Sequence, residues 1–94
     1  MPTVQFTIIK PSKDISFFND PLFKEHVKKN YILTKKIRIE TVLSEDTNVL
    51  SMKINFLSEE YKNEYMEDSL VHQNRAKQVE YNKKNNISVI VDYS

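Results

Sequence analysis

The segment from Lys36 to Leu57, KIRIETVLSEDTNVLSMKINFL, decides the fold of this chain. Apolar and polar residues alternate on both sides of a five-residue polar break, Ser44 to Asn48. Period-two patterning around a short polar break predicts a β-hairpin with one buried face. We expect the other elements to pack around that hairpin. The segment holds no catalytic motif and assigns no function by itself.

The rest of the chain supplies two further strands and two helices. Alternating residues predict strands over residues 3–8 and 87–93. Asp20 and Pro21 are typical of a helix start, and Ser58 is a suitable cap for a second helix. The second helical pattern is longer than the strands beside it, so we expect a bend or break near Asp68-Ser69. The order β-α-β-β-α-β predicts one ferredoxin-like α+β domain over residues 1–94, with a four-stranded antiparallel sheet and two helices on one face.

The same alternation assigns each strand residue to one of two sheet faces. The predicted buried face consists of Val4, Phe6, Ile8, Ile37, Ile39, Leu43, Leu50, Met52, Ile54, Phe56, Ile87, Val89 and Val91. The opposite, open face mixes polar, charged and apolar side chains. It can be solvated, bind nucleic acid, or pack against a second subunit. Its apolar residues, which can line a cavity or a dimer interface, are Ile9, Val42, Leu57 and Ile90.

Composition excludes several kinds of site. The 94 residues contain no cysteine, which excludes disulfides and thiolate metal sites, and no glycine, which excludes glycine-rich phosphate loops. Without glycine, we expect Asn or Asp at left-handed turn positions. A net charge of +1 argues against a dedicated nucleic-acid binder. Lysine far outnumbers arginine, and Asn and Ile are frequent, which indicates an AT-rich genome, bacterial or from phage.

We expect a cytoplasmic protein that does not enter a membrane. No apolar run reaches the roughly 18 residues that span a bilayer. The first predicted strand begins almost at once, so we expect no signal peptide before it.

A few side chains are candidates for a site, each with a structural alternative. His72 lies on the apolar stripe of the second helix, as a boundary residue or as an acid–base group. Tyr61 and Tyr65 are one turn apart and suit either the core or a ligand pocket. Phe17 and Phe18 suit a plug under their loop or, second, ligand contacts. The spacing of His and carboxylate residues predicts no metal site, and we expect no cofactor.

The chain resembles the dimeric α/β-barrel superfamily, and within it the antibiotic-biosynthesis-monooxygenase-like domains. The resemblance rests on the element order and on the junction Ile54-Asn55-Phe56-Leu57-Ser58-Glu59-Glu60, and it covers residues 4–93. It implies a homodimer formed through the sheets. Haem-degrading members use an Asn on the first strand, a Trp and a His; here Gln5 stands on the first strand, Trp is absent, and His72 alone matches.

Two functions of different class follow. The first is a non-catalytic binding or interaction module that forms a homodimer. The second is a cofactor-independent, monooxygenase-like enzyme that acts on a small aromatic or other hydrophobic ligand in an enclosed cavity. The missing Trp, Cys and catalytic triad favour the first. A nucleic-acid-binding domain is a further alternative, disfavoured because the open face lacks aromatic residues on the first and third strands.

Overall fold

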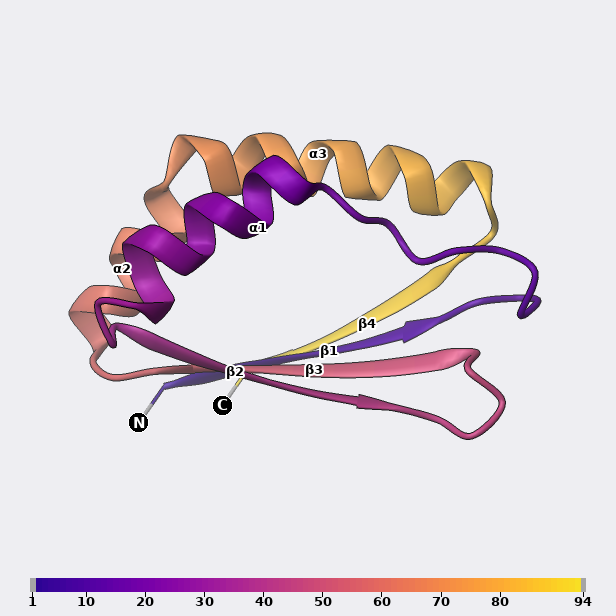
Figure 1. The fold of residues 1–94 in the computed structure, drawn as a ribbon, viewed down its shortest axis with the longest axis horizontal. Helices are drawn as coiled ribbons and strands as arrows, with labels where there is room; N and C mark the ends of the chain where they lie inside the picture. The colour runs from indigo at the N-terminus through magenta and orange to yellow at the C-terminus, as the bar shows by residue number, and fades with distance from the viewer. Residues whose placement is uncertain (1, 94) are drawn as a thin grey trace.

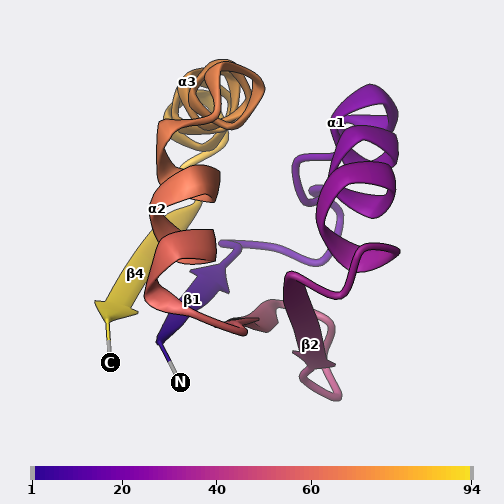
Figure 2. The same cartoon turned by 90° about the vertical axis from the view of Figure 1, so that its left-hand side faces the viewer.

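The computed structural model describes residues 2–93 and shows an α+β fold (Figure 1). Its sheet has four antiparallel strands in the spatial order β2-β3-β1-β4, which is compatible with a ferredoxin-like fold. Three α-helices lie on one side of that sheet (Figures 1 and 2). The elements in chain order are β1 (Thr3–Ile9), α1 (Pro21–Val27), the π-helical segment η1 (Lys28–Ile32), β2 (Ile37–Leu43), β3 (Val49–Phe56), α2 (Glu59–Glu67), α3 (Ser69–Lys84) and β4 (Ser88–Tyr93).

The predicted hairpin is confirmed as β2 and β3, which pair without interruption from Ile37↔Phe56 to Leu43↔Leu50. Its turn is closed by local side chains. The Ser44 hydroxyl donates to Asp46 Oδ1 over 2.6 Å, and the same oxygen accepts the backbone N–H of Asn48. Thr47 lies in the left-handed region with φ 63°.

The second predicted helix is divided in two, as the expected break near Asp68-Ser69 indicates. Asp68 ends α2 and caps α3, and its extended backbone, with ψ 123°, cannot continue a helix. The expectation of two helices therefore becomes three. The first helix begins as predicted, because Asp20 Oδ1 accepts the backbone N–H groups of Leu22 and Phe23.

The core lies where α2 and η1 meet one end of the sheet (Figure 1). Phe56 is fully buried there, and Val4 is 1% exposed. The other buried members of this cluster are Val27, Tyr31, Ile37, Ile54, Tyr65 and Val71. At the same end Val4 pairs with Tyr93, so the first and last strands of the described chain lie side by side.

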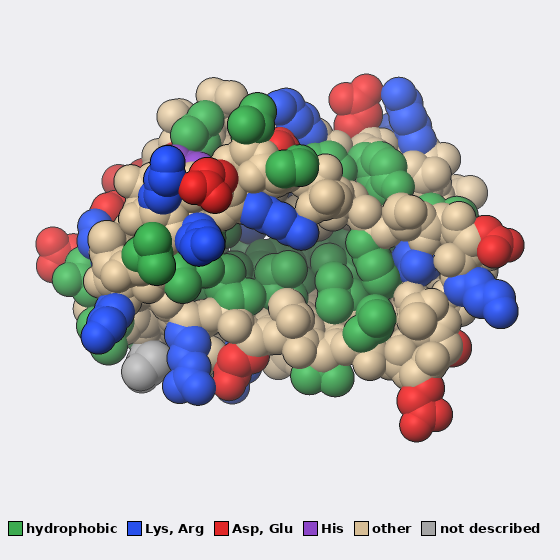
Figure 3. Space-filling view, in the orientation of Figure 1, with side chains coloured by type: hydrophobic (Ala, Val, Ile, Leu, Met, Phe, Trp, Pro, Cys, Tyr) green, Lys and Arg blue, Asp and Glu red, His purple; other side chains and the backbone are tan. Residues whose placement is uncertain are grey.

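Three residues predicted to be buried are exposed. Leu43, Val89 and Val91 are 50%, 39% and 41% exposed, although they belong to the helix-facing alternation. All three lie on β2 or β4, the two outer strands of the sheet. The short α1 does not reach the turn end of the hairpin (Figure 1), and hydrophobic side chains gather in a hollow between helices and sheet (Figure 3). Alternation therefore predicted correctly on which face of the sheet these residues lie, but not whether the helices cover them.

Candidate functional site

The side of the sheet opposite the helices is uncovered (Figures 1 and 2). Strand register arranges its side chains in rows across the strands. One row runs Ile90, Thr7, Ser51 and Val42, from β4 to β2. Thr7 and Ser51, in the middle of the row, are half-buried by their neighbours. The outer ends of this row are apolar and its centre is polar.

The predicted interface residues lie on this face and are exposed. Ile9, Val42, Leu57 and Ile90 are 37%, 68%, 59% and 58% exposed. Ile9, Val42 and Ile90 belong to β1, β2 and β4, and Leu57 directly follows β3. Strand register keeps the four apart: Val42 and Ile90 lie at opposite ends of one row, and Ile9 and Leu57 lie toward opposite ends of the sheet. The face therefore carries four separate exposed apolar side chains.

A second row on the same face carries charge of both signs. It runs Asp92, Gln5, Lys53 and Glu40 across the four strands. The Asn55 amide donates to Glu40 Oε2 over 3.1 Å and holds that carboxylate against the sheet. This face therefore has no single sign of charge.

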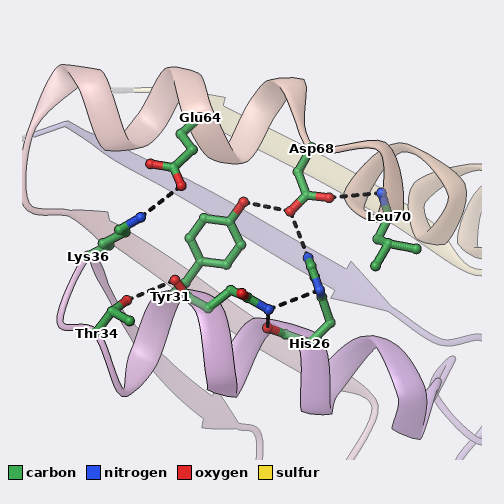
Figure 4. Close-up of polar contacts among 8 residues, drawn as sticks. His26, Tyr31, Thr34, Lys36, Glu64, Asp68 and Leu70 are labelled. Atoms are coloured by element: carbon green, nitrogen blue, oxygen red, sulfur yellow. Dashed lines mark hydrogen bonds and ion pairs between the residues drawn. The ribbon is translucent and has the colours of Figure 1, made fainter.

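A polar cluster joins the first helix to the α2–α3 junction (Figure 4). Asp68 Oδ2 accepts the Tyr31 hydroxyl over 2.6 Å and lies 2.7 Å from His26 Nε2. Asp68 Oδ1 accepts the backbone N–H of Leu70 at the start of α3. The Asn30 amide lies 3.2 Å from His26 Nδ1, which fits the tautomer that donates from Nε2 and accepts at Nδ1.

The π-helical segment η1 explains how His26 and Tyr31 reach the same oxygen. Residues five apart in a regular α-helix point about 140° away from each other. Here the backbone N–H of Leu33 donates to the carbonyl of Lys28 over 2.9 Å, an i to i+5 bond. That wider turn brings residues five apart closer to one side of the helix.

The cluster changes the proton affinities of its members. Burial by itself would raise the pKa of Asp68, but hydrogen bonds from Tyr31, His26 and the Leu70 N–H outweigh it and hold that pKa below its ordinary value. Burial and the hydrogen bond to Asp68 raise the pKa of the Tyr31 hydroxyl. Burial raises the pKa of Tyr65 to about 12. Asp68 is thus an ionised acceptor whose two oxygens are both in use, which suits a structural link better than acid–base chemistry.

The structure separates the candidate site residues rather than gathering them into one pocket. His72 is exposed on α3. Tyr65 is buried, with its ring edge-on to those of Tyr31 and Phe56 at centroid distances of 5.2 and 5.6 Å. Tyr61 is half-buried beneath the Lys36 ammonium, which lies 5.5 Å from its ring centroid.

The two aromatic residues of the first loop make one contact within the loop and one with α3. The ring centroid of Phe17 lies 4.4 Å from the ammonium of Lys10. Phe18 packs against Tyr81 of α3 at 5.6 Å, and the Tyr81 hydroxyl donates to the carbonyl of Ser16. The contact of Phe18 with Tyr81 connects this loop to α3.

Two open grooves mark the surface. The larger, about 640 Å³, runs along the free edge of β2 and is lined by Ile32, Lys35, Lys36, Ile37, Arg38, Ile39, Glu40, Asn55 and Leu57. The smaller, about 210 Å³, lies between α1 and α3 beside Phe23 and Leu70. Neither groove contains His72 or Tyr65.

Sequence reasoning missed the link between His26 and Asp68. The sequence predicts a bend or break near Asp68, but the side chains that Asp68 contacts lie 42 and 37 residues away along the chain, beyond the reach of any spacing rule. Within residues 2–93, no three His, Asp or Glu side chains gather as metal ligands. None of the helices in this range is long and apolar enough to cross a bilayer.

Comparison of the chain with protein-family models, curated proteins and solved structures finds no match.

Proposed function

We propose that this protein is a small, non-catalytic interaction module that works as a homodimer. In this proposal two copies pack their uncovered sheet faces together, in the manner of a dimeric α/β barrel. The observation that carries it is the set of four exposed apolar residues, one from each part of the sheet, on the face without helices. Burying such side chains against a second copy removes apolar surface from water and favours association.

The charges on the face are compatible with self-association. Asp92 and Glu40 are the two ends of a row that also contains Lys53, so two copies can bring opposite charges together. A face of single sign would repel its own copy. The polar centre, formed by Thr7, Ser51 and Gln5, would then lie between the two sheets.

The size of the face predicts a concentration-dependent dimer. Four strands about 4.8 Å apart, each about seven residues long, give a flat footprint of roughly 450 Å² per copy. Standard stable interfaces bury about 800 Å² of accessible surface on each partner. We therefore expect dimer and monomer to exchange.

The cysteine-free composition suits the reducing cytoplasm, which is the location we propose.

Monooxygenase-like activity is the alternative. It needs an enclosed, mostly apolar pocket of at least about 300 Å³ with a few polar groups aimed into it. The two grooves described above are open, and His72 lies on the exposed side of α3. These observations favour the interaction module.

The decisive experiment is sedimentation equilibrium of the wild type, Ile90→Glu and Val79→Glu over a wide range of protein concentration. Ile90 and Val79 are both apolar and 58% and 60% exposed, but Ile90 lies on the open face and Val79 on α3. We expect the wild type and Val79→Glu to dimerise and Ile90→Glu to lose that dimer, because a buried carboxylate has no partner there. A monomeric wild type, or equal dimerisation of all three proteins, would contradict the proposal.

A further inference from the structure

We infer that the free edge of β2 is a second self-association surface, at which β2 of one copy pairs antiparallel with β2 of another around Ile39. This surface shares Glu40 and Leu57 with the open sheet face, but it pairs backbone with backbone at the sheet edge and does not require the face-to-face dimer. It would join two sheets edge to edge into one of eight strands. The inference rests on backbone direction, charge pattern and the shape of the groove along this edge.

The backbone of β2 presents an unpaired set of hydrogen-bonding groups. The Lys36 carbonyl accepts the Leu57 N–H, and the Ser44 N–H donates to the Val49 carbonyl, so even-numbered residues direct their backbone groups toward β3. Antiparallel strands alternate in this respect. The N–H and C=O groups of Ile37, Ile39 and Thr41 therefore point away from the sheet.

The features that usually block such an edge are missing from β2. Its pairing with β3 is continuous over all seven residues, so no bulge bends it, and it contains no proline. Its charged residues, Arg38 and Glu40, are both exposed. Edge charges commonly prevent self-pairing because identical charges meet. Here the strand carries one charge of each sign, two residues apart.

One register makes the strand complementary to itself. A two-fold axis at Ile39 places Arg38 opposite Glu40 of the second copy, and Glu40 opposite its Arg38. Ile39 then faces its own copy, with outward backbone groups on both strands, as the hydrogen-bonded pair of an antiparallel ladder requires. Moving the centre by one residue places Glu40 opposite Glu40 or Arg38 opposite Arg38, which is unfavourable.

Side chains on both sides of the edge leave room for a second strand. The groove of about 640 Å³ is lined on the helix side by Ile37 and Ile39 and on the other side by Arg38, Glu40 and Leu57. Leu57 is 59% exposed and Ile32, beside the groove, is 41% exposed. Arg38 has no carboxylate within ion-pair distance among residues 2–93, so it is available to a second copy.

The opposite edge of the sheet lacks this complementarity. All six residues of β4 are exposed, but Asp92 is the sole charged residue of that strand. Pairing β4 with its own copy around Ile90 places Ser88 opposite Asp92 and forms no ion pair. The β2 edge is therefore the one whose charge pattern selects a register.

A charge-swap experiment tests the inference separately from the face-to-face dimer. Arg38→Glu and Glu40→Arg are each made in an Ile90→Glu background, which removes the face interface. Each single swap places like charges opposite at both ends of the proposed pair. We expect self-association about tenfold weaker than in the Ile90→Glu parent, because two cross-strand ion pairs become two like-charge contacts.

Mixing the two swapped proteins is the sharpest part of the test. A chain with two acidic residues at these positions meets a chain with two basic ones, so the mixture should associate more strongly than either protein alone. Fluorescence-detected sedimentation of one labelled variant with the other unlabelled measures this. Lys83→Glu on α3 controls for net charge and should leave self-association unchanged. If the mixture associates no better than its components, the inference is wrong.

A backbone variant tests the same edge without altering charge. Thr41→Pro removes an outward N–H that takes no part in pairing with β3, and proline is tolerated at such edge positions. We expect it to weaken association in the same background, while Thr41→Val, which keeps the N–H, does not. Circular dichroism confirms that both variants fold. Equal association of the two would overturn the proposed ladder.

Discussion

At the residue scale, the backbone departs from what the glycine-free sequence predicts. Left-handed positions are expected at Asn or Asp, and Asn86 fits with φ 56°. Lys35 and Thr47 also adopt positive φ, at 60° and 63°, which the sequence did not predict. Thr47 is constrained by the hairpin turn, where its N–H donates to the Ser44 carbonyl. Turn geometry therefore overrides the preference of a β-branched residue.

Thr47→Gly should stabilise the protein. A left-handed conformation costs an L-residue roughly 1–2 kcal/mol, and glycine avoids that cost but loses more backbone entropy on folding. We expect a net gain of about 1 kcal/mol in the free energy of unfolding, measured by urea denaturation. Asn86→Gly is the control and should change little, because Asn already tolerates this conformation. Destabilisation by Thr47→Gly would show that its side chain has a role of its own.

Tyr65 should make the protein sensitive to alkaline pH. Burial raises its pKa from 10.0 to about 12. Above pH 10 the unfolded chain releases this proton while the folded chain keeps it, so stability is complete below 10 and falls as pH rises toward 12. The full loss of unfolding free energy is on the order of 3 kcal/mol, because each pKa unit corresponds to about 1.4 kcal/mol.

Urea denaturation at pH 8, 10 and 11 measures this loss of stability. Tyr65→Phe keeps the ring between Tyr31 and Phe56 and should flatten the dependence on pH. Tyr31, whose pKa is also raised, supplies the remaining slope. If the unfolding free energy of Tyr65→Phe falls with pH as steeply as that of the wild type, the loss of stability does not come from the Tyr65 hydroxyl.

At the element scale, the sequence predicts what is local and misses what is distant. The sequence predicts the hairpin because apolar and polar residues alternate along neighbouring positions of the chain. The division at Asp68 follows from a helix longer than its strands and from a residue that can cap. The bond from His26 to the same Asp68 depends on the π-helical turn before Tyr31, which no 3.6-residue pattern indicates.

The sequence also could not predict how exposed the helix-facing residues of the outer strands are. Alternation places Leu43 and Val91 on the helix-facing side, but their exposure depends on which strands lie outermost and how far α1 extends. Those are properties of the packed elements and not of any single strand. The candidate interface residues differ in this respect, because alternation alone puts Val42 and Ile90 on the opposite face.

Asp68→Ala should uncouple the helices. It removes the α3 cap and leaves the Tyr31 hydroxyl and His26 Nε2 without their acceptor. We expect a loss of about 3 kcal/mol at pH 7, measured by urea denaturation. Glu67→Ala, one residue earlier and exposed, is the control and should cost little.

The effect of Asp68→Ala should shrink in acid. The folded pKa of Asp68 lies below its ordinary value of 3.8, so its contribution is present above 3.8 and disappears as pH falls through the folded pKa. Wild type and Asp68→Ala should therefore converge in stability at low pH. A constant difference between them down to pH 2 would indicate that the carboxylate charge is not involved.

At the scale of the whole molecule, the helices cover one side of the sheet and leave the other side and both edges open. The proposed self-association through the open face would link folding to protein concentration. We expect the melting temperature of the wild type to rise with protein concentration, and that of Ile90→Glu to rise less. Differential scanning calorimetry over a range of concentrations measures this. An equal rise of melting temperature with concentration in the two proteins would argue against association through Ile90.

The pairing of Val4 with Tyr93 has a consequence for the connectivity of the chain. Because Val4 of β1 and Tyr93 of β4 are paired at the same end of the sheet, a short linker could connect these two strands there. The hairpin turn at Glu45 and Asp46 lies at the far end and is exposed, so the ring can be reopened there. Such a circular permutant would keep all three strand pairings while β2 and β3 became the terminal segments.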